Sequence, residues 1–147
     1  MGSIEGVFLT PLKIIDVPNG NVLHALKQHE NSFQGFGEAY FSTVKQGVAK
    51  GWKKHTRMVL NLIVPVGAIK FIIFDGRPES ATYNRFMEVI ISPDGNYQRL
   101  TVSPGLWMAF QGISEGLNML LNIASIPHDP SEAENLPLQN DLITYSF

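Results

Sequence analysis

The chain has 147 residues, the length of one ordinary domain, and its 44% hydrophobic and 16% charged residues are typical of a globular protein. It contains no cysteine, which excludes disulfides, thiolate catalysis and cysteine-based zinc sites and fits a cytoplasmic protein. A net charge of -2 argues against a nucleic-acid partner, and no apolar run is long enough to predict a membrane span. We therefore expect one soluble domain over residues 1–147.

Short extended segments separated by turn residues are predicted along most of the chain. In order, we expect one or two strands over 4–17, a helix or a strand over 22–29, strands over 36–44, 52–63, 69–75, 86–92, 97–103, 106–110 and 117–124, and a helix start at 129–132. Asn19-Gly20 and Pro93-Asp94-Gly95-Asn96 are strong turn signals. Many short strands with hardly any helical periodicity predict an all-β barrel or sandwich.

A run of basic residues in the middle of the chain indicates a binding site. No acidic residue lies between Glu38 and Asp75, although this interval holds six of the eleven lysines and arginines. If residues 52–63 are extended, one face carries Lys53, His55, Arg57, Val59 and Asn61. Pro65-Val66-Gly67 would then turn this strand into a hairpin with residues 69–75. A local cluster of positive charge favours a small anionic ligand over an extended nucleic-acid surface.

The spacing within this segment is that of the first sequence motif of cupin barrels. The motif positions are Gly47, Lys53, His55, Leu60 and Gly67, and the turn and strand of the second motif are Ser103–Met108. The expected fold is therefore a cupin jelly-roll barrel with little helix. In metal-binding cupins the ligands occupy the positions of Lys53, His55, Leu60 and Met108. Because lysine is normally protonated, leucine has no donor atom and a thioether is a poor ligand, we predict no metal and no other cofactor.

Four stretches of the chain resemble one branch of the cupins. These are KGWKKH, FDGR, SPGLWMAFQG and NIASIPHDPSEAE, and over about residues 36–134 they resemble the RmlC-like dTDP-4-dehydrorhamnose 3,5-epimerases and the related sugar-nucleotide ketoisomerases. The resemblance implies a homodimer whose barrel holds a nucleotide sugar in deoxysugar and surface polysaccharide biosynthesis. It implies an isomerase or epimerase that moves a proton next to a ketone without a metal.

The resemblance also assigns site residues. The family's base histidine falls on Lys53, so Lys53 or His55 is the expected proton-transfer group, and Lys50 and Arg57 are expected to face the diphosphate. The remaining substrate-binding candidates are Asn61, Ser42, Glu38, Tyr40, Asn118, Asn122, His128 and Trp107. The family's acid tyrosine falls on about Asn122 and its ring-stacking tyrosine on about His128. Because the usual base and acid are replaced, the alternative is a catalytically inactive cupin that binds a sugar or nucleotide.

Overall fold

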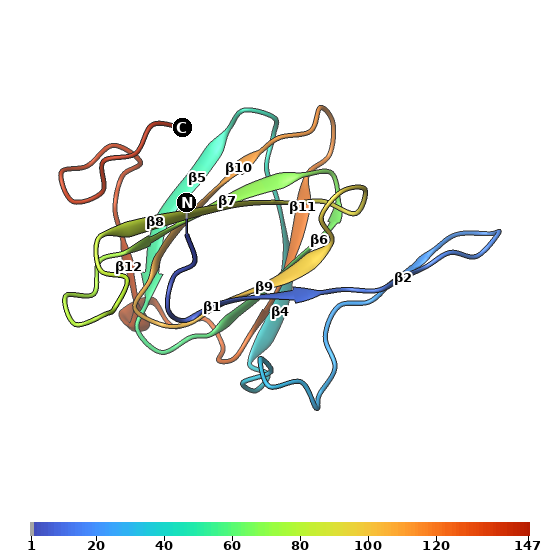
Figure 1. Cartoon of the computed structure of the whole chain (residues 1–147), viewed down its shortest axis with the longest axis horizontal. Helices are drawn as coiled ribbons and strands as arrows, with labels where there is room; N and C mark the ends of the chain where they lie inside the picture. The colour runs from blue at the N-terminus through green and yellow to red at the C-terminus, as the bar shows by residue number, and fades with distance from the viewer. Residues whose placement is uncertain (1) are drawn as a thin grey trace.

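The computed structural model describes residues 2–147, which form a nearly all-β molecule (Figure 1). The strands are β1 (Val7–Pro11), β2 (Ile14–Ile15), β3 (Val22–Leu23), β4 (Glu38–Thr43), β5 (Ala49–His55), β6 (Leu60–Val66), β7 (Ile69–Asp75), β8 (Arg85–Ile91), β9 (Gln98–Val102), β10 (Trp107–Gly112), β11 (Met119–Ala124) and β12 (Ala133–Asn135). A single turn of 3₁₀ helix, Pro130–Glu132, precedes β12. Among the described residues no helix is long and apolar enough to cross a membrane.

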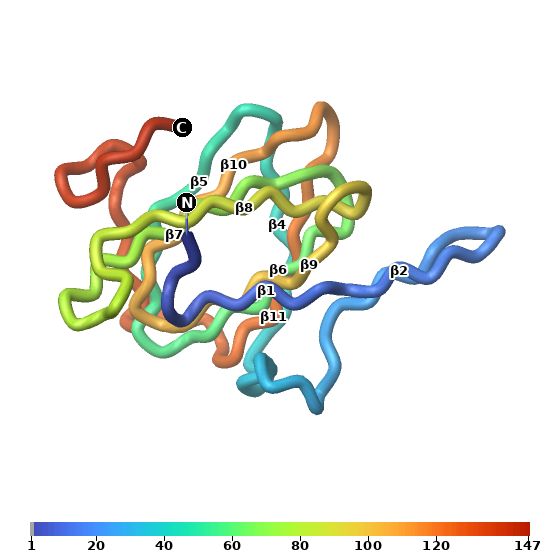
Figure 2. The backbone as a smooth tube through the Cα atoms, in the orientation of Figure 1, coloured from blue at the N-terminus to red at the C-terminus, as the bar shows by residue number. Residues whose placement is uncertain are grey.

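Ten strands form two five-stranded antiparallel sheets. The first sheet has the order β1-β9-β6-β11-β4 and the second has the order β12-β5-β10-β7-β8. The strands β2 and β3 pair with each other and form an arm that extends away from the two sheets (Figure 2). Two antiparallel sheets that enclose one core make a jelly-roll barrel, so the predicted fold class is confirmed.

The core between the sheets is built by alternating side chains. Leu60, Leu62 and Val64 of β6 are buried against Phe71 and Ile73 of β7, which belongs to the other sheet. Burial of apolar area at about 25 cal/mol per Å² makes this contact the main source of folding free energy. The intervening positions of these strands point away from the barrel interior.

The single strand expected over 52–63 is two strands. β5 ends at His55 in the second sheet, and β6 begins at Leu60 in the first sheet. Between them the buried carboxylate of Glu132 accepts hydrogen bonds from the backbone N–H groups of Thr56, Arg57 and Met58, at 3.1, 3.1 and 3.2 Å. A strand would direct successive N–H groups to opposite sides, so this shared acceptor requires a bend. Residues beyond His55 therefore lose the alternation that sequence periodicity predicted.

The predicted hairpin between residues 52–63 and 69–75 is also wrong, because β6 and β7 lie in different sheets. The chain crosses from one sheet to the other at Gly67, which has a φ of +80°. A Cβ atom at this position would lie 2.3 Å from the carbonyl oxygen of Leu117. Gly67 therefore allows the chain to cross from the first sheet to the second, and it does not form a hairpin turn.

The two segments for which a helix was considered have different outcomes. Of residues 22–29, expected to be a helix or a strand, only Val22 and Leu23 form a strand. Arg99 binds the irregular segment that follows, through the carbonyl oxygen of Ala25 at 2.7 Å and the carboxylate of Glu30 at 3.1 Å. The predicted helix start at 129–132 is confirmed, since the side chain of Asp129 accepts a hydrogen bond from the N–H of Ser131 at 3.0 Å.

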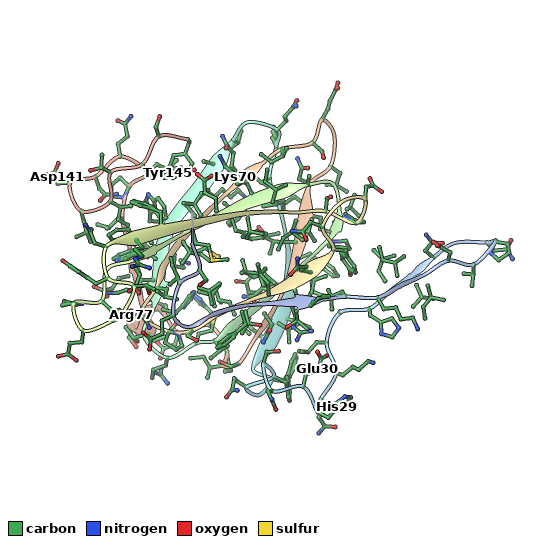
Figure 3. All side chains as sticks on the ribbon, viewed as in Figure 1. His29, Glu30, Lys70, Arg77, Asp141 and Tyr145 are labelled. Carbon is green, nitrogen blue, oxygen red and sulfur yellow. The ribbon has the colours of Figure 1, made fainter. Side chains whose placement is uncertain are left out.

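The C-terminal residues cover the outer face of the second sheet. Trp52 is buried there with Trp107 and with Ile143 of the C-terminal segment, and its indole N–H donates to the carbonyl oxygen of Leu138 at 3.3 Å. The ring of Tyr145 lies 5.9 Å from the ammonium group of Lys70, and Figure 3 shows the two side chains beside each other. This second apolar cluster lies behind β5, the strand that carries the basic residues.

Candidate active site

A cavity of about 300 Å³ lies between the two sheets. Its polar wall residues are Tyr40, Ser42, Lys50, Lys53, His55, Asn122 and Asn135. Its apolar wall residues include Leu60, Leu62, Met108, Phe110 and Leu120. The volume is at the lower end of the range for small-molecule sites, and a mostly apolar cavity with a few polar groups is the usual form of such sites.

His55 is the catalytic candidate with the most clearly defined partners. Its imidazole is held against the buried carboxylate of Glu132 through Nδ1. The two residues are brought together by the pairing of β5 with β12, in which His55 lies opposite Ala133. An ionised carboxylate can only accept a hydrogen bond, so the Nδ1 atom donates and the neutral imidazole keeps its lone pair at Nε2. His55 therefore has the tautomer that a general base requires.

The environment of Glu132 keeps its carboxylate ionised. Burial disfavours the charged form, but hydrogen bonds from His55 and from the backbone of Arg57 and Met58 outweigh it and hold the pKa of Glu132 below its ordinary value. These donors come from the bend between β5 and β6. One carboxylate therefore fixes the shape of the bend and orients the imidazole. In the sequence Glu132 is recognisable only as part of a helix start, and no local pattern indicates this second role.

Two lysines add positive charge to the cavity wall. Lys50 and Lys53 of β5 line the cavity together with His55. The ammonium group of Lys50 donates to the carbonyl oxygen of Thr43 at 2.6 Å, which joins β5 to β4. Two ammonium groups on one wall suit an anionic part of a ligand.

The opposite wall is formed by β4 and β11. Tyr40 and Asn122 are directly paired in the antiparallel register, and the amide Nδ2 of Asn122 donates to the phenolic oxygen of Tyr40 at 3.1 Å. The Oδ1 atom of Asn122 is buried and has no hydrogen-bond partner among the described residues. The Oε1 atom of Glu38 is also buried without a partner, but Glu38 does not line the cavity. Ser42 completes the inward-facing row of β4. Buried acceptors without partners are suited to hydroxyl donors of a ligand.

Two members of the predicted polar face lie elsewhere. Arg57 follows the bend, is largely exposed, and pairs with Asp129 at 3.0 Å, so it does not line the cavity. Asn61 points to the outer side of the first sheet, where its Oδ1 accepts from Arg99 at 3.1 Å and from Thr101 at 2.6 Å. Both were placed by an alternation that the bend interrupts.

Three further candidates also lie outside the cavity. Trp107 is buried on the outer face of the second sheet, with the ammonium group of Lys54 5.1 Å from its ring. Asn118 bonds the backbone of Val44, Ala68 and Ser114 and therefore holds loops together. His128 is exposed in the loop before the 3₁₀ helix. Trp107 therefore has a packing role and does not contact the cavity.

The site residues satisfy the requirements of proton transfer. A cavity that joins an oriented imidazole to two ammonium groups can bind an anionic substrate and remove a proton from it. Within residues 2–147 no three side chains of His, Asp or Glu come together as metal ligands would. The jelly-roll fold and the position of this cavity between its sheets define the class of protein as a cupin.

Comparisons with known proteins identify the branch of the cupins. A dTDP sugar isomerase from Desulfovibrio desulfuricans G20 is 35% identical, covers 97% of this chain and 91% of its own, and superposes with a TM-score of 0.94. The chain therefore belongs to the RmlC-like family of dTDP-4-dehydrorhamnose 3,5-epimerases and related dTDP-sugar isomerases. No family model and no curated protein matches the sequence.

More distant structures share the fold. The 3'-monoepimerase ChmJ from Streptomyces bikiniensis, solved with dTDP-quinovose, is 17% identical over 92% of this chain and 72% of its own, with a TM-score of 0.82. A dTDP-4-dehydrorhamnose 3,5-epimerase from Elizabethkingia anophelis NUHP1 is 12% identical over 99% of this chain and 83% of its own, with the same TM-score of 0.82. At these identities the comparison confirms the barrel and does not assign residues.

Proposed function

We propose that the protein is an isomerase or epimerase of a nucleotide-linked keto-sugar of the dTDP-4-keto-6-deoxysugar type. The observation that carries the proposal is the cavity imidazole of His55, oriented by the ionised carboxylate of Glu132. The relative described as a dTDP sugar isomerase supports the substrate class. Such an enzyme works in deoxysugar and surface polysaccharide biosynthesis, and we place it in the cytoplasm.

In this proposal His55 is the base and Glu132 positions it. A hydrogen on the carbon next to a ketone is acidic enough for removal by a neutral imidazole, and the electrons move into the enolate. Glu132 stabilises the imidazolium that forms, because its carboxylate is already bonded to Nδ1. Lys53 was the other candidate for the base, and it lacks such an orienting partner among the described residues. We propose instead that Lys53 binds the negatively charged part of the ligand.

The lysines of β5 are proposed to bind the diphosphate. Lys50 and Lys53 line the cavity, whereas Arg57 is paired with Asp129 outside it. Ammonium groups bind phosphate oxygens through charge-assisted hydrogen bonds. Asn122 and Ser42 are proposed to bind the sugar, since both face the same cavity.

We also propose that the protein is a homodimer. Phe36, just before β4, and Phe41, in β4, are about two thirds exposed, and Phe8 of β1 is 55% exposed. Large apolar side chains at this exposure are typical of surfaces that another chain covers. Sedimentation equilibrium should give twice the chain mass, and Phe41→Asp should shift the population toward monomer.

The experiment that tests this function combines binding with turnover. We expect dTDP and dTDP-4-keto-6-deoxyglucose to raise the Tm, and the keto-sugar to be converted to an isomer that NMR detects. A raised Tm without conversion of any keto-sugar would support the catalytically inactive cupin instead. No stabilisation by any sugar nucleotide would contradict both. Lys13→Ala, on the arm, is the matched control for Lys53→Ala, which should weaken binding.

A further inference from the structure

Asn135 lines the cavity, although it lies just beyond the part of the chain, about residues 36–134, that resembles the epimerases. It is the last residue of β12, and its register partner is Lys53 of β5. Residues that lie opposite each other in an antiparallel pair have side chains on the same face of the sheet, with Cβ atoms about 5 Å apart. Asn135 and Lys53 are therefore neighbours on the same wall of the cavity.

The preceding residue of β12 confirms which face of this strand is turned to the cavity. Glu134 lies opposite Lys54, and their side chains form an ion pair at 2.7 Å. The ammonium group of Lys54 lies 5.1 Å from the ring of Trp107, which is buried on the outer face of the second sheet. Because successive side chains of a strand alternate between its two faces, Glu134 points outward and Asn135 points inward.

The side chain of Asn135 is available to a ligand. The pairing of β12 with β5 engages backbone groups, so it does not use the carboxamide of Asn135. The residue is exposed, which places it at the mouth of the cavity rather than in its depth. A carboxamide has two N–H donors, and the ammonium group of Lys53 has three. Two neighbouring side chains at the mouth can therefore donate to one ligand group that has several acceptor atoms.

We propose that Asn135 binds an oxygen of the substrate's diphosphate together with Lys53, an inference that rests on the proposed function. A diphosphate offers several acceptor oxygens, so the amide and the ammonium group can each donate to a different one. Lys53 supplies the positive charge, and Asn135 adds a directed hydrogen bond. With the diphosphate held at the mouth, the sugar lies in the cavity beside His55. Asn135 is thus a residue of substrate binding and does not take part in proton transfer.

The test is a series of charges at position 135, with dTDP as the probe and isothermal titration calorimetry as the measurement. Asn135→Asp places a carboxylate beside the diphosphate with almost no change of size, so the Kd should rise by about 10-fold or more. Asn135→Arg adds a cation, and the Kd should fall by about 3-fold or more. Asn135→Ala removes only the hydrogen bond, and the Kd should rise by about 5-fold. With the keto-sugar, Asn135→Ala should raise KM and leave kcat unchanged.

Glu134→Gln is the matched control, since it changes one unit of charge on the outer face of the same strand. It should leave the Kd for dTDP within about 2-fold of the wild type. A change as large as that in Asn135→Asp would show that charge acts over a distance, and would overturn the inference. Equal Kd values for Asn135→Asp and Asn135→Arg would overturn it as well, because a side chain beside the diphosphate must affect binding with opposite signs.

The Tm of each variant without ligand shows whether it is folded. If Asn135→Arg does not fold, the order of affinities decides the test, with the wild type expected to bind most tightly, Asn135→Ala next and Asn135→Asp most weakly. Wild-type binding of dTDP that no substitution at position 135 changes would overturn the role of Asn135 and leave the proposed function intact. If the wild type does not bind dTDP, the proposed function itself is wrong, and the inference is rejected with it.

Discussion

Glu132 is bonded to both sides of the bend between β5 and β6. One oxygen holds the imidazole of His55 and the other accepts three consecutive backbone N–H groups, starting at Thr56. A buried carboxylate with this many donors is stable as an anion, whereas a buried carboxylate without them would be neutral. At the residue scale, the shape of the site and the tautomer of its base therefore depend on a single side chain.

The pKa of Glu132 predicts how this side chain contributes to stability. Its folded-state pKa lies below the ordinary value of 4.5, so its contribution is fully present above pH 4.5 and is lost as the pH falls through the folded-state pKa. At neutral pH, Glu132→Gln should lower the free energy of unfolding by about 1 to 3 kcal/mol. Urea unfolding at several pH values should show this difference shrinking in acid. A constant difference would contradict the assignment.

At the element scale, the acidic segment 129–134, which ends in β12, pairs with the segment 54–57, which begins in β5. Asp129, Glu132 and Glu134 pair with Arg57, His55 and Lys54, respectively. The acid-free interval before Asp75 was visible in the sequence, and the acidic run at 129–134 was its complement. Periodicity could not reveal this, because the partners are 72 to 80 positions apart in the chain. The only indication in the sequence was that an acid-free basic segment and an acidic segment, 129–134, have complementary charges.

The start of β4 depends on a close backbone contact. A Cβ atom on Gly37 would lie 2.0 Å from the carbonyl carbon of Ile126, so Gly37→Ala should displace the strand that carries Tyr40. The expected loss is about 1 to 3 kcal/mol, measured by urea unfolding. Gly95→Ala is the control, because its Cβ would meet only Ser92 at an ordinary 3.5 Å. Equal stability of the two variants would show that the chain relaxes around Gly37.

At the scale of the whole molecule, the barrel could be predicted from short strands and turn residues, whereas only part of the cavity lining could be predicted. Lys53, His55, Tyr40 and Asn122 line the cavity as local alternation or family resemblance predicted. Arg57 and Asn61 do not, because alternation was extended through a bend that a distant carboxylate imposes. Local patterns assign faces within one strand, and long-range contacts decide where that strand ends.

The C-terminal segment should contribute to the stability of the whole barrel. Ile143 is buried against Trp52 on the outer face of the second sheet. Ile143→Ala should therefore lower the free energy of unfolding by about 2 to 5 kcal/mol. Tryptophan fluorescence during urea unfolding measures the change. Leu142→Ala, at an exposed neighbouring side chain, should change stability by less than about 0.5 kcal/mol. Equal effects at the two positions would show that packing of the C-terminal segment on the second sheet does not stabilise the barrel.

The most direct test of the account is deuterium incorporation beside the ketone of dTDP-4-keto-6-deoxyglucose, followed by proton NMR in the wild type and two variants. We expect incorporation in the wild type and its loss by about 100-fold or more in His55→Ala, because the base is gone. Lys53→Ala should keep exchange at saturating substrate and show a raised KM. Exchange that survives in His55→Ala and disappears in Lys53→Ala would contradict the assignment of the base.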